Sequence, residues 1–90
     1  MSQLTQRTTT GDFVTGGSRA LHSVYLTAGS TASSAEIRDG TGAVLLKLSA
    51  AANGDGTYWA ANDKLGVAFS GAINLATIAG TGAAVTVEWA

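Results

Sequence analysis

Apolar and polar residues alternate along much of this chain in short segments, with a period of two residues. The last segment is the clearest, because Val85, Val87 and Trp89 share one face whereas Thr86 and Glu88 lie on the other. This period is typical of a β-strand, in which successive side chains point to opposite faces of a sheet. Such segments recur about every ten residues between glycine-rich turns, which favours an antiparallel sandwich.

The preceding strands are predicted from the same pattern. They comprise residues 19–27, 34–38, 43–48, 65–69 and 73–75. Asp39-Gly40-Thr41-Gly42 separates two of them with residues that tolerate positive φ, so we expect a hairpin there. Every link is too short for a crossover helix. The chain is therefore predicted to be all-β, a small antiparallel β-sandwich or flattened barrel of about seven or eight short strands.

The first twelve residues differ from the rest. Residues 1–12 are polar and rich in threonine, with Leu4 as the one apolar side chain after Met1. Ordering such a segment costs about 1–2 kcal/mol of backbone entropy per residue, which its own side chains do not repay. We therefore expect an extended N-terminal arm that pairs with a neighbouring copy or a larger shell. Residues 13–90 form a single domain that begins at Phe13 and Val14.

Residues 49–63 are expected to be irregular. Ala50-Ala51-Ala52 is compatible with one helical turn, but Asn53-Gly54-Asp55-Gly56 ends any helix at once. Tyr58 and Trp59 follow within this polar stretch. Because adjacent residues of an extended chain point to opposite sides, we expect one ring at the core and the other toward solvent or a neighbour.

Composition indicates that the domain is marginal alone. Of the 41 hydrophobic residues 17 are alanine, which contributes little burial energy, and charged residues make up 12% of the chain. The sequence has no cysteine, so no disulfide can stabilise it. A partner chain is the remaining means of stabilising the domain. We therefore expect a homo-oligomer, most simply a trimer. The candidate contacts with a partner subunit or other binding partner are Leu4, Phe13, Val14, Tyr25, Leu45, Tyr58 and Trp59.

Charge and hydropathy exclude two classes of partner. The net charge is −1 and the five basic residues are scattered singly, whereas nucleic-acid binding needs a concentrated positive surface. The longest run of bulky apolar residues is Val44-Leu45-Leu46, far short of the roughly 20 residues that span a bilayer. The N-terminus has no apolar core of a signal peptide. We expect neither nucleic acid nor membrane as a partner.

Residue types that carry catalysis are nearly absent. His22 is the single histidine, it lies mid-strand, and no Gly-x-Ser-x-Gly motif presents a nucleophile. Asn53-Gly54-Asp55-Gly56 lacks the first and last acidic ligands of a calcium loop, so a tight turn is the better interpretation. We predict no catalytic residue, no cofactor and no metal. The protein is expected to bind or assemble rather than to act as an enzyme.

Two stretches of the chain share a pattern of short strands separated by small-residue turns. The first is residues 21–48, a strand, a Gly/Ser/Thr turn, a strand ending in Asp-Gly and a short aliphatic strand. The second runs from Gly66 through Gly80-Thr81-Gly82 to residues 85–87. This pattern resembles a family of small virion proteins of tailed bacteriophages, the capsid decoration, or cement, proteins. It implies a β-sandwich that is made in the bacterial cytoplasm and binds the major capsid protein on the outside of the virion.

A carbohydrate-binding module or receptor-contacting tail component is the alternative. Aromatic residues near the loops of β-sandwiches stack on sugars, and Tyr58 and Trp59 are the candidates for that role. A sugar platform presents two or three aromatic rings on one face. The sequence predicts one ring per face at this position, which favours the virion interpretation.

Overall fold

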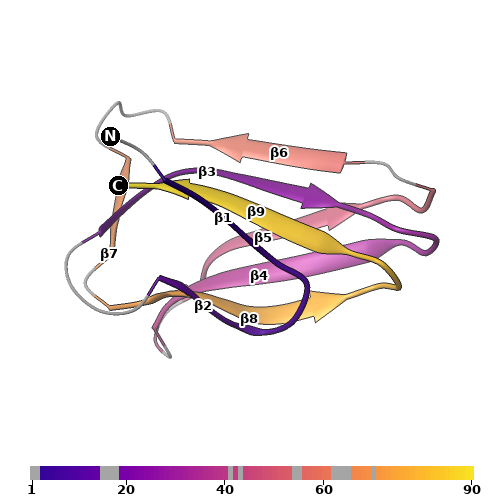
Figure 1. The fold of residues 1–90 in the computed structure, drawn as a ribbon, viewed down its shortest axis with the longest axis horizontal. Coiled ribbons are helices and arrows are strands. Elements are labelled where there is room, and N and C mark those ends of the chain that lie inside the picture. Colours follow the sequence, from indigo (N-terminus) through magenta and orange to yellow (C-terminus); the bar gives the residue numbers. More distant parts are fainter. Residues whose placement is uncertain are drawn as a thin grey trace.

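The computed structural model describes residues 3–14, 19–40, 42, 44–53, 56–61, 66–69 and 71–90. These residues form nine strands and no helix, and the strands make two antiparallel sheets that pack against each other (Figure 1). The predicted all-β sandwich is confirmed. The strand count exceeds the expected seven or eight because two segments that the sequence pattern did not assign as strands, near the N-terminus and around Tyr58, also pair.

Each sheet contains four strands side by side, and one sheet has a short fifth. Sheet A has the order β1 (Gln3–Arg7), β9 (Ala84–Trp89), β3 (Arg19–Thr27) and β6 (Gly56–Ala60), with β7 (Val67–Phe69) beside the start of β3. Sheet B has the order β2 (Gly11–Val14), β8 (Ile73–Ala79), β4 (Ser33–Asp39) and β5 (Val44–Ala50). The predicted hairpin between residues 34 and 48 is therefore present as β4 and β5.

The core lies between the sheets and follows from the alternation in the central strands. Val24 of β3 pairs with Val87 of β9, and Leu26 pairs with Val85, so all four side chains point inward and are fully buried. Sheet B contributes its own buried residues opposite them, which include Ala35, Ile37, Ile73 and Leu75. Apolar residues at every second position thus bury one face of each sheet and leave the other exposed.

The N-terminal segment differs from the expected arm. β1 pairs with β9 of the same chain over its whole length, from Gln3 opposite Trp89 to Arg7 opposite Val85. The chain then crosses to sheet B, where β2 pairs with β8 (Figure 1). The physical reason is that β9 would otherwise expose a row of unpaired backbone groups, which a strand without buried side chains can still satisfy.

The segment around Tyr58 is also more regular than expected. Tyr58 and Trp59 belong to β6 rather than to a polar loop, and they pair with Tyr25 and Val24 of β3. Ala50 ends β5 and a turn follows it, with no helix among the described residues there. The tertiary pairing with β3 outweighs the loop character of the flanking polar residues, because aromatic residues pack well on a pleated surface.

This distribution of burial predicts how two leucines respond to truncation. Leu26 is fully buried whereas Leu4 of β1 is 73% exposed. We expect Leu26→Ala to lower the free energy of unfolding by about 2–5 kcal/mol, since it leaves a cavity. Leu4→Ala serves as the matched control and is expected to change it by less than about 0.5 kcal/mol. Urea denaturation measures both values, and equal losses for the two variants would contradict the assigned core.

Candidate functional site

The outward side of sheet A gathers side chains from four strands into rows. Tyr25 lies between Thr86 of β9 and Tyr58 of β6, and Gln6 of β1 lies beyond Thr86. Directly opposed residues of a sheet point to the same face, so these four side chains form one row. A parallel row comes from the same strands. We call the two rows together the tyrosine face, which consists of Leu4, Gln6, Ser23, Tyr25, Tyr58, Ala60, Thr86 and Glu88.

The two tyrosines form the aromatic half of this face. Their ring centroids are 6.5 Å apart and the ring planes are tilted by 51°. Tyr25 is 42% exposed and Tyr58 is 64% exposed, so both rings offer surface to a partner. Gly56 allows this arrangement, because a Cβ atom at that position would collide with the phenol group of Tyr25. A side chain at position 56 would therefore displace the ring.

The other half of the tyrosine face is polar. The amide nitrogen of Gln6 donates a hydrogen bond to Thr86 Oγ1 at 3.3 Å, and Ser23 Oγ donates to Glu88 Oε1 at 3.3 Å. Glu88 is the one ionisable carboxylate of the face, and the Ser23 hydroxyl orients it. The face thus combines two phenol rings, hydroxyl and amide groups, one carboxylate and the exposed Leu4. Such a mixture suits non-covalent recognition, because tyrosine has both an apolar body and a polar tip.

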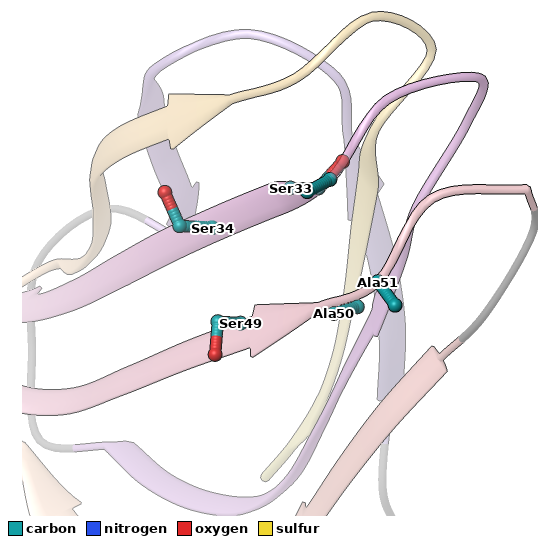
Figure 2. A pocket seen from close by; sticks show the side chains of 6 residues that line it. Ser33, Ser34, Ser49, Ala50 and Ala51 are labelled. Carbon is teal, nitrogen blue, oxygen red and sulfur yellow. The ribbon is translucent and has the colours of Figure 1, made fainter.

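A shallow depression lies on sheet B, at the end where β4 begins and β5 ends (Figure 2). It has a volume of about 440 Å³ and is lined by Ala32, Ser33, Ser34, Ser49, Ala50 and Ala51. Ser34 and Ser49 lie opposite each other on the two strands. His22 belongs to β3 in the other sheet, so it is not placed to activate either hydroxyl as a general base.

Charged side chains of β4 and β5 form ion pairs with one another. The Glu36 side chain is 16% exposed and accepts from Arg38, whose Nε lies 2.6 Å from Glu36 Oε1. Lys47 approaches the other carboxylate oxygen at 3.9 Å. The three residues form a structural ion-pair cluster beside a second depression of about 290 Å³. Within the described part of the chain, no three histidine or acidic residues are grouped so that they could hold a metal ion.

The structure separates the seven contacts expected from the sequence. Leu4, Tyr25 and Tyr58 meet on the tyrosine face. The side chain of Phe13 is buried in the core, and those of Val14 and Trp59 are partly buried against it. Leu45 lies within β5, but its side chain is outside the described residues.

Sequence reasoning also missed part of the face. The outward positions of Thr86 and Glu88 follow from the alternation in the last strand, but neither was expected as a contact. Ser23 lies next to His22, where the pairing of β3 with β9 shifts its register and defeats a simple alternation. No sequence pattern predicted Gln6 as part of this face, because nothing in residues 1–12 indicated a partner strand.

A scan against protein-family models, a search of curated proteins and a search of solved structures found no match. None of the described residues forms a helix long and apolar enough to cross a membrane.

Proposed function

We propose that this chain is a non-enzymatic structural protein that binds the outside of a tailed-phage capsid in many copies and stabilises it. The observation that carries the proposal is the convergence of Leu4, Tyr25 and Tyr58 on one face. These residues come from three different strands, β1, β3 and β6, and the sequence predicts each of them as a contact. The resemblance of residues 21–48 to virion decoration proteins supports a capsid as the partner.

The tyrosine face supports this role physically. Tyrosine rings provide large contact areas and lose little side-chain entropy on binding, which is why they are frequent at the centres of interfaces. Leu4 extends the apolar contact across β1, and Glu88, which accepts from Ser23, places a carboxylate on the same face. Each contact need only be weak, because a homo-oligomer, with a trimer as the proposed form, raises the overall affinity through effective concentration.

Binding to capsids tests this proposal. We expect Tyr25→Ala and Tyr58→Ala each to weaken binding to expanded, undecorated capsids by about tenfold, the effect of an interface residue worth more than 1 kcal/mol. Val44→Ala is the matched control, because Val44 is 41% exposed but lies on β5 of sheet B. Co-sedimentation measures the occupancy. Unchanged occupancy for both tyrosine variants, or an equal loss for Val44→Ala, would refute the proposed face.

One observation favours a second candidate, a carbohydrate-binding module. Trp59 points into the sandwich, so it does not belong to the sugar platform that was expected to include it. Tyr25 takes its place, so the tyrosine face presents two rings, beside the hydroxyl of Thr86 and the amide of Gln6. Two rings on one side with polar neighbours match the general design of a sugar platform more closely than the sequence alone indicated.

A glycan array distinguishes this candidate from the capsid role. If the chain is a carbohydrate-binding module, the wild-type protein binds a defined set of glycans, Tyr58→Ala abolishes that binding, and Tyr58→Phe retains it because the ring still stacks. Trp59→Ala then weakens binding only as far as it destabilises the fold, which a thermal melt reports. An array without any bound glycan removes the candidate and leaves the capsid role unaffected.

A further inference from the structure

β1 is attached to the domain in an unusual way. None of its five side chains is buried, and two of the nearest groups on β9 hold it through polar contacts. Trp89 Nε1 donates to Thr5 Oγ1 at 3.1 Å, and Gln6 contacts Thr86. The remaining attachment is the backbone pairing of β1 with β9. Release of β1 therefore removes no side chain from the core.

The residues after β1 form a bent connection that one arginine holds closed. The Arg7 guanidinium donates to the carbonyl oxygens of Thr9 and Thr10 at 3.0 Å and of Asp12 at 3.3 Å. Gly11 has a φ of 143°, and a Cβ atom there would lie 2.6 Å from the guanidinium. The bend thus depends on Arg7 and on glycine at position 11. We call residues 8–10 the hinge.

Release of β1 would leave an incomplete sheet. β9 carries the buried Val85 and Val87, so it stays in place, and its backbone groups facing the vacated side would lose their partners. Unpaired backbone groups at a sheet edge are satisfied by another strand. The segment Gln3–Arg7 fits this edge in register and in side chains, because it occupies the edge in the structure.

We propose that copies of this chain exchange β1, so that β1 of one copy pairs with β9 of another. The exchanged form rebuilds the same five residue pairs, the Thr5–Trp89 contact and the Gln6–Thr86 contact. It differs from the closed form at the hinge, which straightens and loses the contacts of Arg7. Exchange of an identical element is a low-cost route to oligomers. Three consecutive threonines in the hinge favour the extended conformation that the exchanged form needs.

This inference is independent of the proposed function, because it concerns the isolated chain. It also accounts for how an N-terminal segment can be an ordered edge strand in a single chain and still connect copies. The arm expected from the sequence and the β1 strand of the structure are then the exchanged and closed forms of the same residues.

Disulfide trapping between chains tests the exchange. The sequence has no native cysteine, so only the introduced cysteines can form a disulfide. Gln6 and Thr86 are directly opposed across β1 and β9. Opposed residues of antiparallel strands have Cα atoms about 4.5–5.5 Å apart, which a disulfide spans. One batch carries Gln6→Cys and a second carries Thr86→Cys. The two are mixed, incubated at increasing concentration and oxidised, and crosslinked peptides are quantified by mass spectrometry.

The control mixture pairs Gln6→Cys with Ser49→Cys, an exposed position on sheet B that records random collisions. Exchange predicts that the 6–86 link exceeds the 6–49 link by at least about tenfold, the ratio that corresponds to 1.4 kcal/mol, and that its yield rises with concentration. Equal yields of the two links at all concentrations would overturn the proposal. A chain carrying both Gln6→Cys and Thr86→Cys must crosslink internally in dilute solution, and its failure would overturn the register on which the proposal stands.

Arg7→Ala in the Gln6→Cys chain supplies a second measurement. Loss of the guanidinium contacts weakens the closed hinge and is expected to raise the yield of the 6–86 link about tenfold. Arg38→Ala is the matched control, because Arg38 contacts Glu36 on sheet B and not the hinge. The same increase with Arg38→Ala, or no increase with Arg7→Ala in a protein whose circular dichroism is unchanged, would contradict the role of the hinge.

Discussion

The pairing of β3 with β9 is the contact on which the rest of the molecule depends. Val24 opposite Val87 and Leu26 opposite Val85 place four branched side chains in the core. The same register turns Tyr25 and its neighbour on β9 outward. Because the side-chain period of a strand is two, a shift by one residue would bury the tyrosine and expose the valines. β1 attaches to one side of this pair and β6 to the other, so the core, the tyrosine face and the edge strand all follow from one register.

Residue patterns predicted the fold wherever apolar alternation is strong. The bounds of β3 were expected at residues 19–27 and are found there, and the last strand was recognised from its valines. β1 was not predicted because backbone pairing and polar contacts hold it in place, and these do not produce a pattern of hydrophobic residues. β6 was not predicted because glycine and aspartate, which are typical of turns, precede it. The strand becomes evident only when Tyr58 is placed opposite Tyr25. Local patterns thus indicate strands that bury one face. They do not indicate strands such as β1 and β6, which form because a neighbouring strand is available for pairing.

The candidate site shows the same limit. Leu4, Tyr25 and Tyr58 could each be chosen from the sequence as exposed apolar or aromatic residues, but their meeting on one face required the pairing between strands that are distant in the chain. Trp59 was predicted to take one of two sides, and its position opposite Val24 decides that it faces inward. Phe13 is buried in the core, and the sequence pattern did not show that the residues around it pair with β8.

Native-state hydrogen exchange of the backbone amides, followed residue by residue with nuclear magnetic resonance, tests this account most directly. The amides of β3, paired on both sides and next to the core, should exchange most slowly, through openings that approach global unfolding. Those of β1 should exchange at least about tenfold faster, because release of that strand leaves the core intact. Protection of β1 equal to that of β3, or rapid exchange within β3, would contradict a structure organised around the β3–β9 pair.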